Sequence, residues 1–301
     1  MIEINTKRPR ILFETLGGGN LGLGHVYRAV ALANQFKHVA HNVRISCLGN
    51  TARQIAKDAG FFLSGGNYYE PDILIQDLPI MAWDINRNRG GPLLVSIVDE
   101  AHEGNGDMIF SLLPSVSSRK ITHVYSGPPY AILRPEFTPP AIYDPNGPVV
   151  VTLGGVDPNG FTWEVVRKLE EAGHKNVHPI LGPGFAGVQE VNVQPKISEV
   201  LRVASVAITN CGMTLWECAA LGIPVVAIAA NDRELARIQK IQNMGDSWFY
   251  FSGTTPSAVA YYVKLGLREA NRLSEIGRRQ VDGRGASRVA AKILEVWKED
   301  L

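Results

Sequence analysis

A histidine stands at the end of the first glycine-rich segment, which reads Gly22-Leu23-Gly24-His25. Free imidazole is half-protonated near about pH 6.5, so a histidine can act as a general base near neutrality. Arg28 follows at i+3 on the same face of a predicted helix, where it can orient the segment or pair with a carboxylate. The pattern predicts a proton-accepting site, with a helix-capping loop and an incidental surface histidine as the alternative.

Two aspartates close predicted strands in the first half of the chain. Asp77 ends DILIQD (72–77) and Asp99 ends LLVSIVD (93–99). Open α/β sheets bind ligands outside the carboxyl ends of their strands. We therefore expect Asp77 and Asp99 to bind sugar hydroxyls or to orient His25. Capping of the following helix or turn is the alternative for each.

Two further glycine turns follow predicted strands in the second half. The first contains Gly154 and Gly155, and its Asp-Pro-Asn-Gly end is also strong turn chemistry. The second consists of Gly212, Met213 and Thr214. This second turn can cradle a diphosphate on its backbone N–H groups while Glu217 accepts hydrogen bonds from a ribose diol. Thr214 and Glu217 equally have the T-x-x-E spacing of a capping box, so both interpretations stay open.

The first glycine cluster, 17–22, matches the dinucleotide fingerprint G-x-G-x-x-G. A nicotinamide site also needs an acidic residue about 20 positions further on, at the end of the second strand. That strand ends Cys47-Leu48-Gly49-Asn50 without a carboxylate, and no Gly-Lys-Ser/Thr follows the cluster. The sequence therefore argues against a dinucleotide site and a P-loop. Because the histidines are scattered without metal-ligand spacing, we expect no metal and no cofactor.

The elements that would position these residues fall into two halves. Apolar runs such as NVRISCL (42–48) and MIFSLL (108–113) are separated by helical patterns, as a parallel sheet covered on both faces requires. Residues 138–147 (TPPAIYDPNG) interrupt the pattern as a linker, and strand, glycine turn and helix then recur. We predict an α/β protein of two doubly wound, Rossmann-like domains, 1–137 and 148–301, with the last helix free to pack back on the first.

Composition narrows the class of protein. The 30 Lys and Arg residues nearly balance the 29 Asp and Glu residues, and a net charge of +1 argues against a nucleic-acid-binding protein. The three cysteines show no C-x-x-C spacing, which favours a reducing compartment. We find no signal-peptide pattern, and the longest charge-free apolar stretch, 218–230, is shorter than the ~20 residues of a membrane span. We therefore expect a cytoplasmic protein without a membrane span.

Five segments taken together resemble the UDP-sugar hydrolases of the pseudaminic acid pathway and the related spore-coat polysaccharide proteins. The segments are GLGHVYRAVALA (22–33), GPPYAILRPEF (127–137), VTLGGVDPNG (151–160), TNCGMTLWECAALGIP (209–224) and DGRGASRVA (282–290). They extend over nearly the whole chain in the order and spacing of that family. The combination is more specific than any single glycine turn.

The resemblance implies a GT-B arrangement, in which the C-terminal domain holds the nucleotide and the N-terminal domain faces the sugar. It also implies metal-independent, inverting hydrolysis of a UDP-linked amino or deoxy sugar, with His25 as general base for the attacking water. Glu217 would bind the ribose, and the two later glycine turns would face the phosphates. To the ligand site we also assign Gly22, Gly24, Arg28, Asp77, Asp99 and Asn231. A GT-B glycosyltransferase with a UDP-sugar donor and a non-catalytic nucleotide-sugar sensor are the alternatives.

The chain departs from the family pattern after the strand that follows Gly-Ile-Pro. Family members usually carry Asn-Gln there, and this chain has Asn231-Asp232. A carboxylate replaces amide donors with a negative charge. The change could alter the sugar that fits or discourage a nearby phosphate.

Overall fold

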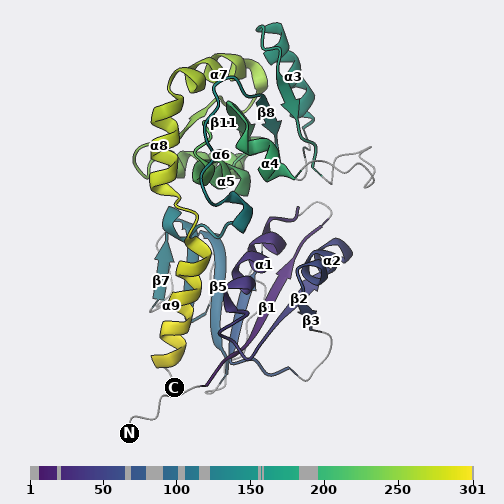
Figure 1. The fold of residues 1–301 in the computed structure, drawn as a ribbon, viewed down its shortest axis with the longest axis vertical. Helices are drawn as coiled ribbons and strands as arrows, with labels where there is room; N and C mark the ends of the chain where they lie inside the picture. Colours follow the sequence, from purple (N-terminus) through teal and green to yellow (C-terminus); the bar gives the residue numbers. More distant parts are fainter. Residues whose placement is uncertain are drawn as a thin grey trace. The chain divides into compact units, whose positions relative to one another are not determined.

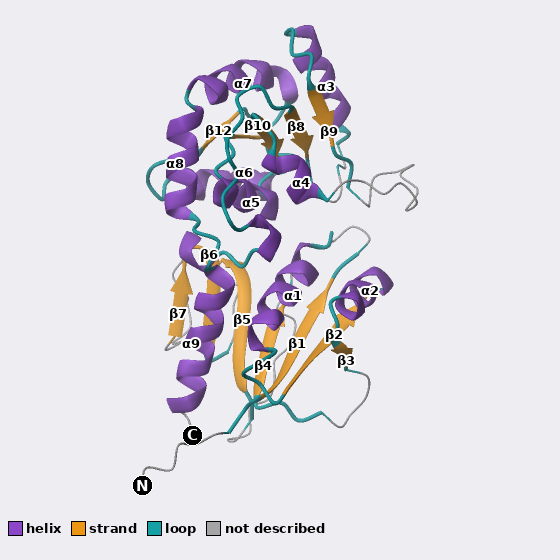
Figure 2. Cartoon of the chain, viewed as in Figure 1, coloured by secondary structure: helices purple, strands orange, loops and turns teal. Residues whose placement is uncertain are grey.

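The computed structural model divides into two compact units, one formed by Met1–Ile132 with Arg284–Leu301 and the other by Leu133–Gly283 (Figure 1). Each unit is built on one parallel β-sheet with helices packed against it (Figure 2). The expected linker, 138–147, lies inside the second unit, and the last helix, α9 (Gly285–Glu299), belongs to the first. The structure describes residues 7–18, 22–64, 69–78, 91–100, 106–114, 123–154, 157, 159–182 and 196–299.

The first unit contains a seven-stranded sheet in the order β3-β2-β1-β4-β5-β6-β7. Its strands are β1 (Arg10–Leu16), β2 (Asn42–Leu48), β3 (Phe62–Leu63), β4 (Ile73–Asp77), β5 (Leu93–Glu100), β6 (Met108–Leu113) and β7 (His123–Ser126). The central strands are apolar over most of their length because both faces are covered. The register places Thr15 of β1 beside Asp77 of β4, so these two strands end at the same edge.

Three helices, α1 (Gly24–Phe36), α2 (Asn50–Asp58) and α9, pack on one face of this sheet and share its core. Alternate residues of β1, Ile11 and Phe13, point into that core and are fully buried. Phe13 meets Phe36 of α1, with the ring centroids 6.1 Å apart. Burial of each such side chain stabilises the fold by about 1.5–3 kcal/mol, which fixes α1 and its first turn against the sheet.

The second unit contains a five-stranded parallel sheet in the order β12-β11-β10-β8-β9. Its strands are β8 (Val149–Thr152), β9 (Val177–Pro179), β10 (Val206–Thr209), β11 (Val225–Ala227) and β12 (Phe249–Phe251). Its helices are α3 (Phe161–Glu171), α4 (Ile197–Arg202), α5 (Met213–Leu221), α6 (Asp232–Gln242), α7 (Val259–Arg268) and α8 (Ala270–Gln280). Helices α3 and α7 contribute to one core with the sheet, and α5 packs against α8, β10 and β11.

The ends of α5 explain its position. Gly222 follows the last residue in a left-handed conformation, with φ +77°, so the chain turns sharply and enters β11. Gly277 of α8 faces α5 so closely that a Cβ atom there would lie 3.1 Å from the Ala219 carbonyl oxygen. The close approach of these helices holds α5 with its N-terminus directly after β10.

The two parallel sheets with flanking helices confirm the predicted doubly wound α/β class. The predicted strands at 42–48 and 108–113 have the observed bounds. The sequence does not predict β3, β7 or β12, which are two to four residues long and too short to show a period. Within the described ranges, no helix combines the length and the apolar character needed to cross a bilayer.

Candidate functional site

The first sheet reverses its winding direction between β1 and β4, because β2 and β3 lie on one side of β1 and the remaining strands lie on the other. Parallel α/β sheets bind ligands at such a switch point, beside the carboxyl ends of the strands. His25 stands in the first turn of α1, which follows β1, and Asp77 is the last residue of β4. The fold thus brings together two side chains that are 52 residues apart in the sequence.

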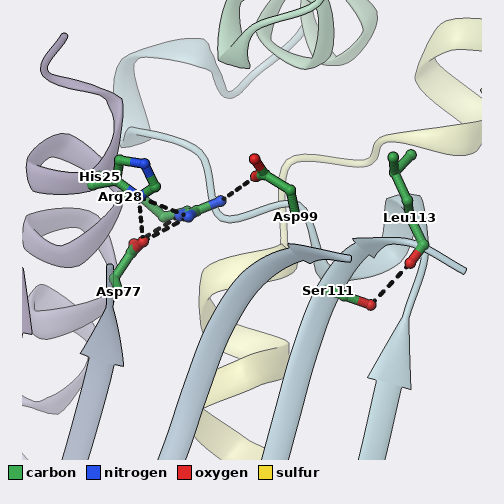
Figure 3. A network of polar contacts seen from close by, with 6 residues as sticks. All are labelled: His25, Arg28, Asp77, Asp99, Ser111 and Leu113. Carbon is green, nitrogen blue, oxygen red and sulfur yellow. Dashed lines mark hydrogen bonds and ion pairs between the residues drawn. The ribbon is translucent and has the colours of Figure 1, made fainter. Parts of the chain in front are cut away.

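His25, Arg28 and Asp77 form one hydrogen-bonded group (Figure 3). His25 Nδ1 lies 2.7 Å from Asp77 Oδ1. Arg28 donates from Nε to Asp77 Oδ2 at 2.7 Å and from Nη2 to Asp77 Oδ1 at 2.6 Å, a two-pronged ion pair. Because an ionised carboxylate only accepts, Nδ1 of the neutral imidazole is the donor and its Nε2 carries the lone pair. The geometry defines an oriented proton acceptor.

Charge and burial keep this group in place. The side chains of Arg28 and Asp77 are 4% and 1% exposed. Burial opposes ionisation of Asp77, but the Arg28 charge and its hydrogen bonds outweigh burial and hold the pKa of that carboxyl below its ordinary value. Burial also opposes the charge on Arg28, yet Asp77 and Asp99 raise the pKa of the guanidinium. Asp77 therefore remains an acceptor for His25 at neutral pH, while the histidine itself is partly exposed.

Asp77 and Asp99, which the sequence predicts either to bind sugar hydroxyls or to orient His25, have different surroundings in the structure. Both oxygens of Asp77 are engaged by His25 and Arg28, which favours orientation of His25 over sugar binding. Asp99, near the end of β5, lies with Oδ1 3.4 Å from Arg28 Nη1 (Figure 3). Its side chain is 18% exposed, compared with 1% for Asp77.

The glycines before His25 shape the entry into α1. Gly22 has φ +69°, a left-handed conformation that favours glycine, and its carbonyl oxygen accepts a hydrogen bond from Gly18 N at 2.8 Å. Gly24 is the first residue of α1. Leu23, at the N-cap position, has no side-chain acceptor for the first backbone N–H groups. The loop therefore turns the chain into the helix without a polar cap.

The second sheet has its own switch point between β8 and β10. Gly154 follows β8 with φ +86°, and a Cβ atom there would lie 3.1 Å from Asn210 Nδ2. A Cβ atom on Gly212, after β10, would lie 3.1 Å from Asn210 Oδ1. The Asn210 side chain thus fills the space between the two glycine turns. Its Oδ1 atom is buried and accepts no hydrogen bond from the described residues.

The helices that follow these turns differ at their N-termini. Asp157 accepts hydrogen bonds from Phe161 N at 3.0 Å and from Thr162 N at 2.7 Å, so a carboxylate of the chain occupies the start of α3. Helix α5 begins with Gly212 at the N-cap position, where there is no side chain to accept from its first N–H groups. A free helix N-terminus favours an anion. The start of α5 is therefore the better phosphate-binding candidate of the two.

Thr214 and Glu217 do not form the capping box that their spacing allowed. Thr214 is the second residue of α5, whereas the box requires it at the N-cap. Glu217 Oε1 instead accepts hydrogen bonds from Arg134 Nη2 at 2.9 Å and from Arg134 Nε at 3.2 Å. Burial raises the pKa of the Glu217 carboxyl above its ordinary value, against the opposing effect of Arg134. Met213 of the same predicted turn is the first residue of the helix. Gly155, which belongs to the earlier predicted turn after β8, lies outside the described residues.

Asn231 has a structural role at the start of α6. Its Oδ1 accepts from Glu234 N at 3.0 Å as the N-cap of the helix, and Asp232 is the first helical residue. Glu234 in turn accepts from Ala230 N at 2.8 Å and from Asn210 Nδ2 at 3.0 Å. The Glu234 carboxylate therefore lies next to the second switch point.

Sequence reasoning missed three residues of these groups. Glu234 had a signal, since Asn231-x-x-Glu234 is the N-cap and N3 pattern of a helix start. Asn210 directly follows a predicted strand, but its spacing does not indicate that its side chain lies between the two glycine turns. Arg134 is 83 residues from Glu217, so no local pattern links them. Among the described residues, no group of three or more His, Cys, Asp or Glu side chains is arranged to hold a metal ion.

Comparison with known proteins gives two similar sequences, and no protein-family model matches the chain. The uncharacterised protein MJ1062 of Methanocaldococcus jannaschii is 25% identical over 74% of this chain and 56% of its own length. The spore coat polysaccharide biosynthesis protein SpsG of Bacillus subtilis is 22% identical over 60% of each chain. The chain thus spans 56% and 60% of the length of these curated relatives.

Solved structures share the fold along almost the whole chain. MurG of Acinetobacter baumannii has a TM-score of 0.61 at 13% identity, covering 95% of this chain and 100% of that chain. The spinosyn forosaminyltransferase SpnP has a TM-score of 0.63 at 14% identity, covering 96% and 99%. HepE of Anabaena in complex with UDP-glucose has a TM-score of 0.55 at 9% identity, covering 95% and 100%. The fold is that of the GT-B glycosyltransferases, which confirms the predicted fold class.

Proposed function

We propose that this protein transfers a sugar from a UDP-sugar donor to an acceptor hydroxyl, with His25 as the general base. The observation that carries the proposal is the oriented group of His25, Asp77 and Arg28 at a switch point of a parallel sheet. The fold supports it, because SpnP is a forosaminyltransferase and HepE binds UDP-glucose. The similarity to SpsG supports a role in polysaccharide synthesis.

In this proposal the first unit supplies the proton acceptor. His25 Nε2 takes the proton of the acceptor hydroxyl while the hydroxyl oxygen bonds to the anomeric carbon. The bond from that carbon to the phosphate oxygen breaks, and UDP leaves with the electron pair. The Asp77 carboxylate, 2.7 Å from Nδ1, stabilises the imidazolium that forms. A base of this kind contributes about 10²–10⁴ in rate, and direct displacement inverts the anomeric carbon.

The second unit binds the nucleotide in this proposal. The backbone N–H groups at the start of α5, after Gly212, face the diphosphate and stabilise the charge that grows on it. Gly154 allows the backbone to approach the phosphates, and Gly155 belongs to the same proposed turn. Glu217 accepts hydrogen bonds from the ribose. Asn231 orients the start of α6 beside this group.

Hydrolysis is the second candidate, favoured by the resemblance of the five sequence segments to UDP-sugar hydrolases. Water then replaces the acceptor hydroxyl, and His25 has the same task. The substrate in that case is a UDP-linked amino or deoxy sugar of the kind found in the pseudaminic acid pathway. The fold matches favour transfer, because SpnP is named a transferase.

One experiment separates the candidates. UDP-amino and UDP-deoxy sugars are incubated with the protein in ¹⁸O-labelled water, with and without a panel of sugar and lipid-linked acceptors. Transfer gives an unlabelled glycoside of inverted configuration only when the right acceptor is present. Hydrolysis places ¹⁸O on the anomeric carbon of the free sugar without any acceptor. UDP binding with neither product would contradict both and favour a nucleotide-sugar sensor.

A further inference from the structure

The proposed mechanism leaves the ion pair between Arg134 and Glu217 unexplained. Arg134 stands directly before a short 3₁₀ turn, η4 (Pro135–Phe137), and Glu217 stands in the middle of α5. The guanidinium donates to Glu217 Oε1 from Nη2 at 2.9 Å and from Nε at 3.2 Å. Both donors therefore converge on one of the two carboxylate oxygens.

Other contacts hold Arg134 in this orientation. Its guanidinium carbon lies 4.7 Å from the centre of the Phe137 ring, which is fully buried. Its Nη1 lies 3.4 Å from Glu136 Oε1. A planar guanidinium stacked on an aromatic ring loses little further freedom when it donates hydrogen bonds. Arg134 is thus a pre-organised donor for Glu217.

Burial opposes the ionisation of Glu217, and Arg134 favours it. Its side chain is nearly buried, and burial raises the pKa of the carboxyl. The charge and hydrogen bonds of Arg134 act in the opposite direction, whereas the nearby Glu136 adds to the effect of burial. An ionised carboxylate offers acceptors on both oxygens, and protonation converts one of them into a donor. The ionised form lets both oxygens accept hydrogen bonds, so it suits two adjacent hydroxyls that donate.

We propose that Arg134 is a positioning residue for ribose recognition. By donating to Oε1 from Nη2 and Nε, it holds the Glu217 side chain so that the second oxygen, Oε2, faces the 2′- and 3′-hydroxyls of the nucleotide. The inference rests on the proposed function, in which Glu217 binds the nucleotide. Arg134 thus controls selectivity for ribonucleotides through its contact with Glu217, without touching the ligand.

The selectivity between UDP and 2′-deoxy-UDP measures this role. Calorimetric titration of the full chain gives the affinity of each nucleotide for the wild type, Arg134→Met, Arg134→Lys and Glu217→Gln. Arg202→Met is the matched control, because Arg202 donates to the Glu136 carbonyl oxygen at 2.8 Å on the same segment. A merely structural Arg134 would change both affinities by the same factor and leave their ratio unchanged.

We expect the wild type and Arg202→Met to prefer UDP by about tenfold or more, the size of a hydrogen bond to a charged group. Arg134→Met and Glu217→Gln should each reduce the ratio to below about threefold. Arg134→Lys keeps the charge but not the paired donors, so its ratio should lie between those of the wild type and Arg134→Met. If Arg134→Met does not fold, Arg134→Lys alone tests the proposal.

Each contrary result has a distinct meaning. A wild-type ratio that is unchanged in Arg134→Met, or in Arg134→Lys where that is the folded variant, overturns the inference and leaves the proposed function standing. Wild-type protein that binds both nucleotides equally overturns the ribose role of Glu217, and the role of Arg134 with it. Wild-type protein that does not bind UDP overturns the proposed function itself.

Discussion

Asp77→Asn introduces an amide into a group where Arg28 can only donate. The arginine donates to both oxygens of Asp77, and His25 shares Oδ1 with Arg28 Nη2. The new amide nitrogen must therefore face either Arg28 Nε or the position shared by Nη2 and His25. In the first case two donors oppose each other. In the second the amide donates to His25 Nδ1, which moves the ring proton to Nε2 and removes the lone pair that the base needs.

The expected magnitudes follow from burial. Arg28 is 4% exposed, and removal of one partner of a buried ion pair costs about 3–5 kcal/mol. In a unit of about 150 residues, each kcal/mol lowers the melting temperature by about 2–4 °C. We therefore expect the melting temperature of the first unit to fall by about 6–20 °C. Turnover at a temperature where the variant is folded should fall by about 10²–10⁴.

The opposite end of β4 supplies a matched control. Asp72, which precedes the strand, pairs with Arg10 at 3.2 Å, and their side chains are 20% and 43% exposed. Such exposed ion pairs contribute about 0–1 kcal/mol. Asp72→Asn should therefore lower the melting temperature by less than about 4 °C and leave turnover unchanged.

Scanning calorimetry and UDP release from a UDP-sugar measure the two effects on the same samples. Equal losses of melting temperature in the two variants would show that burial does not make the Arg28–Asp77 pair more stabilising than the Arg10–Asp72 pair. Full turnover in folded Asp77→Asn would refute the orientation of His25 by Asp77. The two results are independent, so stability and chemistry are tested separately.

Three further predictions concern the same groups. The pKa of Asp77 is lower in the folded state than the usual unfolded value near 3.9. Ionised Asp77 therefore stabilises the fold fully above about pH 3.9, and this stabilisation is lost as the pH falls through the folded pKa. Calorimetry below about pH 4 should show a steeper loss of stability for the wild type than for Asp77→Asn. Gly154→Ala, at φ +86° and against Asn210, should weaken UDP binding about tenfold. Gly160→Ala, at φ +64° in open space, should lower stability by about 1–2 kcal/mol, as Gly154→Ala should, but leave UDP binding unchanged. Equal UDP affinities of the two variants would contradict this. Glu217→Ala should weaken UDP binding about tenfold or more in calorimetry, and unchanged affinity would exclude its ribose role.

The sequence predicted the architecture because its signals are local and repeated. Unalternating apolar runs separated by amphipathic segments identify parallel strands and their helices, and a glycine turn marks where each sheet begins. The strands that escaped prediction, such as β7 and β12, are short segments at sheet edges. Their pairing depends on the neighbouring strand, so their own residues show no clear strand pattern.

The candidate sites were predictable to the extent that they lie at strand ends. His25 and Asp77 were found because each follows or closes a strand, and the order of strands in the sheet then brings them together. The pairing of Arg134 with Glu217 depends on the tertiary packing of η4 on α5, which no spacing encodes. The same holds for Asn210, whose place between two glycine turns follows from the adjacency of β8 and β10.

The central claim is that His25 is the proton acceptor in a reaction that releases UDP. The most direct test measures UDP release from UDP-sugars, with acceptors present and with EDTA, for the wild type and for His25→Ala, alongside UDP binding to both. We predict rapid release by the wild type, a loss of at least about 10² in His25→Ala, and UDP affinities within about twofold of each other. Full release of UDP by His25→Ala would contradict the account.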